Sequence, residues 1–176
     1  MDSSGCVLDS SVFNGQPGRE HYRLLKKLSD DVHGKEIFDI GTWMGASALA
    51  LSFNRENVVH SFDLVHSFSL PQRPNIQYHL ENIVTDTPAR EQWKERILAS
   101  PLIFLDIDPH EGKDEYVFYE WLRDNKFKGM LVCDDIHHFE GMRTNFWSKI
   151  PDAYKTDLTS QGHWSGTGLV QFTSST

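Results

Sequence analysis

Four aspartates stand in two close pairs in the second half of the chain: Asp106 with Asp108, and Asp134 with Asp135. Carboxylate oxygens gathered without cysteine are the ligands that hard cations such as Mg²⁺ or Mn²⁺ prefer. Without a cation, several carboxylates held together would repel one another, and some would take up protons. We therefore predict that at least two of the four bind a divalent metal ion. The alternative, for Asp108 or Asp135, is a cap on a following helix.

Three basic side chains follow these pairs and are candidates for accepting a proton. His110 and Lys113 come soon after Asp108, and His137 comes soon after Asp135. Histidine is the usual base near neutral pH, so His110 is the preferred candidate. Because the chain contains 9 histidines, nearness to a motif has limited weight, and a surface or supporting position is the alternative for each.

A turn bounded by two glycines, Gly41 to Gly45, is the second feature with chemical potential. Its glycines let the backbone, including Thr42, pass close to a ligand, and Ser47 follows with a free hydroxyl at a helix start. The spacing is not G-x-G-x-x-G, so the dinucleotide fingerprint is absent. Asp63 ends the next apolar run about twenty residues later, where an acid can accept hydrogen bonds from ribose hydroxyls. Together these features favour an adenosine-type ligand over a simple tight turn.

Short apolar strands alternating with helices must position these residues. The rhythm predicts a doubly wound, Rossmann-like α/β fold with a mostly parallel seven-stranded sheet and an antiparallel C-terminal strand pair. The carboxyl ends of parallel strands share one edge, where such sheets bind ligands. Asp39, Asp63, Asp106 and Asp134 all stand at predicted strand ends. The predicted strands cover residues 37–40, 58–62, 76–80, 102–105, 130–133, 154–158 and 168–172, and the predicted helices cover residues 19–28, 46–51, 88–100, 115–124 and 139–150.

Length and composition fit one domain. A chain of 176 residues, 39% hydrophobic and 24% charged, can bury a proper core. We predict an N-terminal arm or lid at residues 1–18, with a disordered tail as the alternative, and a single domain at residues 19–176. The formal net charge of −8 argues against general nucleic-acid binding, which usually needs a basic face.

Cysteine usage and hydropathy bound the compartment. Cys6 and Cys133 lie far apart without metal-site spacing, and Cys133 stands in an apolar run, which favours a reduced, buried thiol. No apolar run approaches the roughly 18 residues of a membrane span, and the N-terminus lacks the apolar core of a signal peptide. We therefore expect a soluble, cytoplasmic protein without membrane or nucleic-acid partners.

Four segments, taken in order, resemble one family. They are Phe38 to Ser47 (FDIGTWMGAS), Ser61 to Asp63 (SFD), Phe104 to Asp106 (FLD) and Leu131 to Asp135 (LVCDD). In this order and spacing they resemble the class I S-adenosylmethionine-dependent methyltransferases. The resemblance is closest to the metal-dependent O-methyltransferases, which include catechol-type enzymes and enzymes acting on sugar hydroxyls of macrolides and glycans. It covers roughly residues 19–172.

The resemblance implies S-adenosyl-L-methionine as cofactor and Mg²⁺ or Mn²⁺ as metal. On the family pattern, Asp63 would hold the ribose, and the Glu81-Asn82 turn would lie near the adenine. The residues that would line the methionine part of the cofactor are Asp39, Gly41, Gly45 and Ser47, with Thr42 in the same turn.

The same resemblance assigns the metal and the base. Asp106, Asp134 and Asp135 match the metal-binding acids of the family. The family's base follows the first of these acids closely; here Pro109 stands at that position and His110 comes one residue later. The metal would coordinate a substrate hydroxyl and lower its pKa, His110 or Lys113 would take the proton, and the oxyanion would attack the methyl group in line.

Three alternatives of other classes remain open. The stretch from Asp106 to Asp108 also looks like the D-x-D motif of haloacid-dehalogenase-like phosphatases, although Pro109 and His110 follow where that family has a hydroxyl residue. A D-x-D sugar-nucleotide transferase shares the motif, although the chain is short for one. A non-catalytic cofactor-binding module would use the acids only as caps.

The substrate is the least determined prediction. The predicted metal site points to an O–H acceptor on a small molecule, and a small domain with an open cleft leads us to favour a sugar or glycan hydroxyl over a catechol. His163 and Trp164, in a glycine-rich turn, are candidates for a pocket wall, with a core or surface role as the alternative. The arm at residues 1–18 could serve as a swapped lid in a homo-oligomer.

Overall fold

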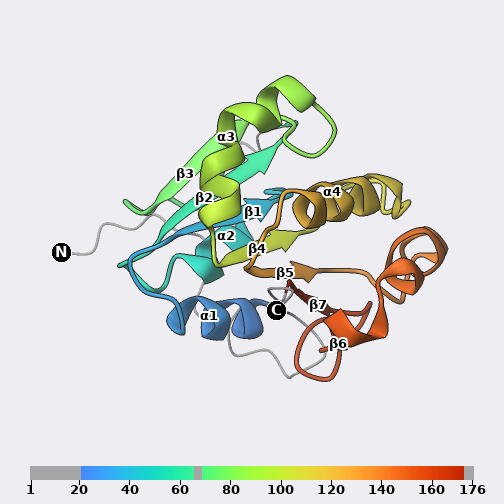
Figure 1. The fold of residues 1–176 in the computed structure, drawn as a ribbon. Coiled ribbons are helices and arrows are strands. Elements are labelled where there is room, and N and C mark those ends of the chain that lie inside the picture. Colours follow the sequence, from blue (N-terminus) through green and yellow to red (C-terminus); the bar gives the residue numbers. More distant parts are fainter. Residues whose placement is uncertain (1–20, 66–68, 173–176) are drawn as a thin grey trace.

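A seven-stranded sheet forms the middle layer of the molecule (Figure 1). The computed structural model describes residues 21–65 and 69–172. The strands follow the order β3-β2-β1-β4-β5-β7-β6, and β7 runs antiparallel to both of its neighbours. The predicted doubly wound sheet with an antiparallel C-terminal strand pair is therefore confirmed.

The observed elements lie close to the predicted ranges. The helices are α1 (Tyr22–Asp30), α2 (Ala46–Leu51), α3 (Thr87–Ala99) and α4 (Lys113–Asp124), with shorter turns η2 (Met142–Phe146), η3 (Trp147–Lys149) and η4 (Asp152–Tyr154). The strands are β1 (Glu36–Ile40), β2 (Val58–Asp63), β3 (Ile76–Leu80), β4 (Leu102–Leu105), β5 (Met130–Cys133), β6 (Lys155–Asp157) and β7 (Gly168–Gln171).

Alternate residues of the central strands face two separate cores. Helices α1 and α2 cover one face of the sheet, and α3 and α4 cover the other (Figure 1). In β4, Phe104 packs in the core beneath α1 and α2, whereas Ile103 and Leu105 pack in the core beneath α3 and α4. Because both faces are covered, β4 is apolar along its whole length, as parallel strands of this kind usually are.

The predicted helix at residues 139–150 is helical in the structure, but its turns are of mixed type rather than one regular α-helix. Residues 142–146 form a π-helical turn, and a short 3₁₀ turn follows it. The hydroxyls of Thr144 and Ser148 donate to carbonyls four residues earlier, which competes with regular helix bonding. In addition, Asn145 donates to the carbonyl of Glu111, at 2.8 Å. The bond of Asn145 holds the segment against the loop before α4. Hydrophobic periodicity alone does not reveal any of these side-chain bonds.

Some predictions fall on other parts of the chain. The N-terminal arm at residues 1–18, with Cys6, lies outside the described residues. The predicted buried, reduced thiol is observed at Cys133, and burial raises its pKa well above the ordinary value. Among the described residues, none of the helices has the length and apolar composition that crossing a membrane requires.

Candidate functional site

The glycine turn after β1 is held directly against the end of β4. Gly41 has φ +105°, and a Cβ built there would lie 1.6 Å from the carbonyl oxygen of Asp106. Gly45 has φ +78° at the start of α2, and a Cβ there would lie 2.7 Å from Pro71 Cδ. Both positions therefore require glycine, for backbone conformation and for space. The close approach brings the turn and the first acid of the second half together.

Asp39 lies beneath this turn rather than in the cleft. Its Oδ2 accepts a hydrogen bond of 2.6 Å from the Ser61 hydroxyl, which lies 2.7 Å from the hydroxyl of Thr42. Within the described part of the chain, Asp39 Oδ1 has no hydrogen-bond partner. Burial raises the pKa of Asp39 to about 7, against the lowering effect of the Ser61 and Ser47 hydroxyls. Asp39 thus supports the turn from below.

The raised pKa of Asp39 makes a testable prediction about pH. The ordinary pKa of an aspartate is 3.8, so Asp39 ionises at lower pH in the unfolded chain than in the folded one. The free energy of unfolding therefore falls as pH rises from about 4 to about 7. Asp39→Asn keeps a carbonyl for Ser61 and removes this cost. At pH 8 the variant should exceed the wild type in free energy of unfolding by up to about 4 kcal/mol, at about 1.36 kcal/mol per pKa unit. Urea unfolding from pH 3.5 to 8 should show the gap closing toward low pH; a constant gap would exclude titration of Asp39 as its cause.

The carboxylate of Asp63, at the end of β2, organises the rim of the cleft. Its Oδ2 accepts from the backbone N–H of Trp43, at 2.8 Å, and its Oδ1 accepts from those of Leu64 and Val65. Trp43 is 72% exposed, so its indole stands free above the turn. Carboxylate oxygens can accept more than one hydrogen bond, so Asp63 retains capacity for a ligand hydroxyl.

The end of β3 lies beside Asp63, because Leu80 pairs with Asp63 in the sheet. Glu81 accepts a hydrogen bond of 2.9 Å from Trp93 Nε1, and Asn82 Oδ1 accepts from the backbone N–H groups of Val84 and Thr85. An asparagine turn of this kind fixes a loop by side-chain to backbone bonding. Both residues line the cleft.

The acids of the second half meet at the ends of β4 and β5. Leu105 of β4 pairs with Cys133 of β5, so Asp106 and Asp134 follow at the same level of the sheet. Burial raises the pKa of Asp106 well above its usual range, and the charges of Asp134 and Asp135 raise it further. This mutual repulsion is what a bound cation would relieve.

His110 lies beside these acids. Its Nδ1 is 3.5 Å from Asp135 Oδ2, its Nε2 is 3.2 Å from Asp108 Oδ1, and its ring stacks on Phe139 at 4.5 Å. One ligand atom from each of Asp106, His110 and Asp135 lies within 4.8 Å of the others. The three side chains therefore have the donor types and the spacing for a divalent ion. The side chain of Asp108 itself is 95% exposed.

Asp134 turns toward two histidines. Its Oδ2 lies 3.2 Å from His163 Nδ1 and 3.3 Å from His21 Nδ1. Burial acts to raise the pKa of Asp134, but the hydrogen bond with His163 and the charges of both histidines lower it overall. His163 thus lies in the wall of the cleft. A pocket wall is one of the two positions that the sequence allows for this residue.

One cleft of about 820 Å³ joins the two halves. It runs from Gly41, Trp43 and Asp63 to Asp106, Asp135 and His110, with Glu81 and Asn82 in its wall. Asp134, His163 and His21 also line it. Among the predicted cofactor residues, Asp39, Thr42, Gly45 and Ser47 are not in the described lining. Thr42 and Gly45 belong to the turn itself, and Asp39 and Ser47 are buried behind it.

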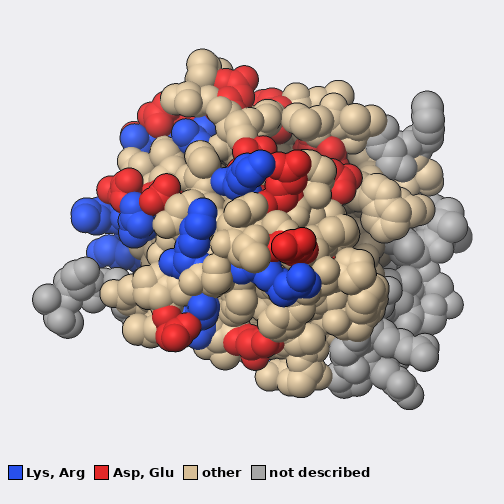
Figure 2. Space-filling view, turned by 90° about the vertical axis from the view of Figure 1, so that its right-hand side faces the viewer, with Lys and Arg blue, Asp and Glu red and all other residues tan. Residues whose placement is uncertain are grey.

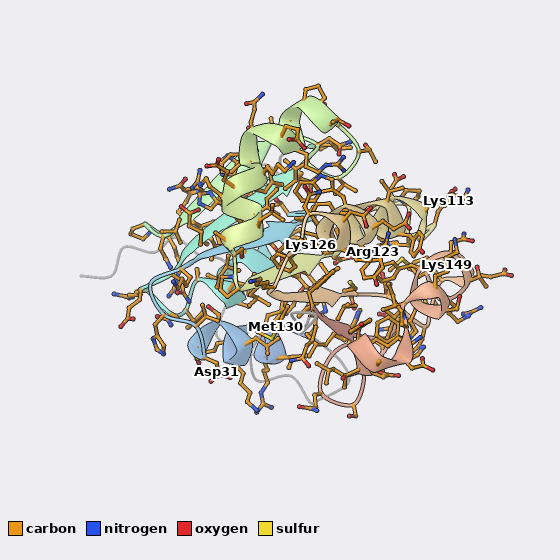
Figure 3. All side chains as sticks on the ribbon, in the orientation of Figure 1. Asp31, Lys113, Arg123, Lys126, Met130 and Lys149 are labelled. Atoms are coloured by element: carbon orange, nitrogen blue, oxygen red, sulfur yellow. The ribbon has the colours of Figure 1, made fainter. Side chains whose placement is uncertain are left out.

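Two of the candidate bases lie elsewhere. Lys113 is at the outer end of α4 (Figure 3), and its ammonium pairs with Glu111 at 2.8 Å, which raises its pKa. His137 Nε2 lies 2.7 Å from Asp157 Oδ2 on β6. Neither is among the described residues that line the cleft. Of the three, the structure brings only His110 to the acids.

Comparison with known proteins gives the fold. The sequence matches no family model, and no curated protein is significantly similar to it. Among solved structures, a "putative caffeoyl-CoA O-methyltransferase" from Staphylococcus aureus gives a TM-score of 0.57 at 13% identity, over 97% of this chain and 87% of that one. Cofactor-bound Rv0187 from MTB gives 0.55 at 14% identity, over 86% and 78%.

A third similar structure is a "putative sam-dependent methyltransferase" from Streptococcus mutans, with a TM-score of 0.53 at 11% identity, over 84% of this chain and 48% of that one. The chain has the fold of class I S-adenosylmethionine-dependent methyltransferases. The likeness is one of fold, and it agrees with the resemblance carried by the four sequence segments.

Proposed function

We propose that this protein is an S-adenosylmethionine-dependent, divalent-metal-dependent O-methyltransferase acting on a hydroxyl of a small molecule. The observation that carries the proposal is the single cleft in which a glycine turn and a strand-end acid adjoin a cluster of carboxylates. Proteins with α/β folds usually bind their ligands at this end of the sheet, where the carboxyl ends of the strands lie. Two sites with different chemistry would then share one volume.

The first half of the cleft suits a nucleoside cofactor. Asp63 would accept from ribose hydroxyls through the lone pairs that its bonds to the backbone N–H groups of the rim leave unused. The backbone at Gly41 lies in the lining without a side chain in the way, and Glu81 and Asn82 offer polar groups in the lining beside Asp63. That a solved structure of the same fold is cofactor-bound supports cofactor binding by this protein.

The second half suits a divalent ion and a hydroxyl acceptor. Asp106 and Asp135 would hold the ion, with Asp134 as a neighbouring acid. When bound, a divalent cation lowers the pKa of a coordinated hydroxyl. His110 would accept the proton, because its imidazole lies beside these acids, with Nδ1 3.5 Å from Asp135 Oδ2, and histidine is the usual base near neutral pH. The cleft walls would align the acceptor oxygen with the methyl group, and alignment is worth several orders of magnitude.

The acceptor proposed is a sugar or glycan hydroxyl. Carboxylates and imidazoles line the acid end of the cleft, which favours an acceptor with several hydrogen-bonding groups over a flat apolar ring. On the face seen in Figure 2, Lys and Arg side chains are interspersed with Asp and Glu rather than gathered in one patch. This mixture, with the net charge of −8, gives no support for a nucleic-acid acceptor.

Calorimetry with S-adenosylmethionine, with and without Mn²⁺, tests the proposal. We expect cofactor binding in both conditions, a separate heat for Mn²⁺, and methyl transfer to one member of a panel of sugars and catechols. Turnover should stop in excess chelator and return with Mn²⁺. No cofactor binding would contradict the methyltransferase assignment, and full turnover in chelator would contradict the metal requirement.

The base is tested by a matched pair of substitutions. His110→Ala should lower kcat by about 10²–10⁴-fold, the usual contribution of a positioned base. Lys113→Ala should leave kcat within about twofold, because its side chain is 68% exposed and pairs with Glu111. Steady-state kinetics at saturating cofactor measure both. Equal losses in the two variants would argue against His110 as the proton acceptor.

A further inference from the structure

A second group of ligand-type side chains lies in the cleft wall beside the acids. It comprises His21, next to the start of α1, Asp134 after β5, and His163 in the loop before β7. One ligand atom from each lies within 4.8 Å of the other two. These three residues come from distant parts of the chain and converge only through the fold.

We propose that His21, Asp134 and His163 form a binding site for a borderline divalent metal ion of the Zn²⁺ kind. The site is separate from the acid group, Asp106 and Asp135, which would hold Mg²⁺ or Mn²⁺ in the proposed function. The family resemblance places Asp134 with the acids, whereas the structure turns its carboxylate between two imidazoles. The proposal does not depend on methyl transfer, because it concerns ion binding alone.

The spacing of the ligand atoms fits a tetrahedral ion. Zn²⁺ binds histidine nitrogen at about 2.0–2.1 Å and carboxylate oxygen at about 2.0–2.2 Å. Tetrahedral geometry then separates neighbouring ligand atoms by about 3.3–3.5 Å. Asp134 Oδ2 lies 3.2 Å from His163 Nδ1 and 3.3 Å from His21 Nδ1. The carboxylate oxygen is thus already close to the required distance from both nitrogens.

Two buried atoms of this group lack the hydrogen bonds that their burial calls for. His21 and Asp134 are only 3% and 4% exposed. Within the described residues, His21 Nδ1 and Asp134 Oδ1 have no hydrogen-bond partner, since the 3.3 Å contact of His21 does not have hydrogen-bond geometry. Buried polar groups are nearly always satisfied by protein, water or an ion. A metal ion would use the nitrogen lone pair and the carboxylate together.

The donor set separates this site from the acid group. Two imidazoles and one carboxylate suit Zn²⁺ and related ions, whereas carboxylates and water suit Mg²⁺ and Mn²⁺. Zinc sites with three protein ligands keep a fourth position for water or substrate. Because all three side chains line the cleft, that fourth position would be accessible to a molecule bound there.

A hydrogen-bonded network is the competing explanation. The Ser165 hydroxyl lies 2.7 Å from His163 Nδ1, the same atom that faces Asp134. If the group were only a network, Ser165 and His163 would serve to orient Asp134 and no ion would bind. Zn²⁺ binding to the wild type therefore distinguishes the two, and Ser165→Ala tests whether the hydroxyl contributes, because it removes the hydroxyl and keeps all three ligands.

The experiment measures Zn²⁺ binding to the full chain after chelator treatment, in Mg²⁺ sufficient to occupy the acid group and without cofactor. We expect one equivalent of Zn²⁺, and Co²⁺ in its place should show the visible d–d absorption of a tetrahedral or five-coordinate site. His21→Gln and His163→Gln should each weaken Zn²⁺ binding by at least about 10–100-fold, since even outer-shell changes at metal sites cost that much. Ser165→Ala should bind as tightly as the wild type.

His33→Gln is the matched control, because the His33 side chain is 67% exposed and pairs with Glu56 away from the cleft. Thermal unfolding in excess chelator checks that each variant folds. If His21→Gln fails to fold, because its ring packs on Phe104 at 4.9 Å, His163→Gln decides. Absence of Zn²⁺ binding in Mg²⁺, or wild-type affinity in His163→Gln, would overturn the site. Neither result would bear on S-adenosylmethionine binding.

Discussion

Replacing Asp106 by asparagine should abolish methyl transfer and at the same time stabilise the metal-free protein. Burial and the charges of Asp134 and Asp135 raise the pKa of Asp106, so its ionised form costs stability above the ordinary carboxyl pKa. Asparagine removes that cost, so the variant should have the higher free energy of unfolding at pH 8. It also removes a metal ligand. Since a bound metal supplies several kcal/mol, turnover should fall by about 10³-fold or more.

The opposite signs of these two effects separate loss of metal from loss of fold. Thermal unfolding in chelator should give a higher Tm for Asp106→Asn than for the wild type, and added Mn²⁺ should raise the Tm of the wild type only. Asp152→Asn is the control, because the Asp152 side chain is 97% exposed, pairs with Lys155 and is not among the described residues that line the cleft; its activity should change little. A variant at Asp106 that is inactive and less stable would indicate structural damage instead.

The strands and their terminal acids were predictable because a strand that is buried on both faces of the sheet needs a continuous run of apolar residues. Leu102–Leu105 and Met130–Cys133 are such runs, and their ends place Asp106 and Asp134 without reference to other contacts. Parallel pairing then makes these ends neighbours. The acids at one edge of the sheet therefore follow from local pattern and one topological rule.

Other features depended on contacts that sequence pattern does not encode. His21 carried no signal, because its place beside Asp134 depends on how α1 docks against the sheet. Lys113 comes soon after Asp108 in sequence, yet α4 begins at that residue, and its side chain bonds to Glu111. The irregular segment at residues 142–146 arises from side-chain bonds to the backbone, such as that of Thr144.

The glycine turn lies between these cases. Its two glycines indicated a close approach of backbone to a ligand, and the structure shows a close approach of backbone to backbone. The main reason why Gly41 must be a glycine is that the carbonyl of Asp106 occupies the space that a side chain would take. The same residue therefore links the cofactor half of the cleft to the acid half.

Among substitutions that add a single methyl group in this region, Gly41→Ala should accordingly be the most destabilising. Its Cβ would lie 1.6 Å from the Asp106 carbonyl oxygen, and φ there is +105°. Because both partners are backbone, no rotamer change can relieve the clash, and β1 and β4 would have to separate. We expect a loss of at least about 4 kcal/mol in the free energy of unfolding, out of the roughly 5–15 kcal/mol of a typical domain.

Gly34→Ala isolates the contribution of backbone conformation. Gly34 also has positive φ, +62°, but no described atom lies within 4 Å of the place that a Cβ would take there, so only the strain of about 1–2 kcal/mol remains. Urea unfolding of both variants gives the difference, which is the cost of the clash. Similar losses in the two would mean that the turn can move away from Asp106 freely. A large difference would instead show that the glycine turn and the end of β4 at Asp106 are held together by contact between their backbones. Neither half of the cleft could then shift alone.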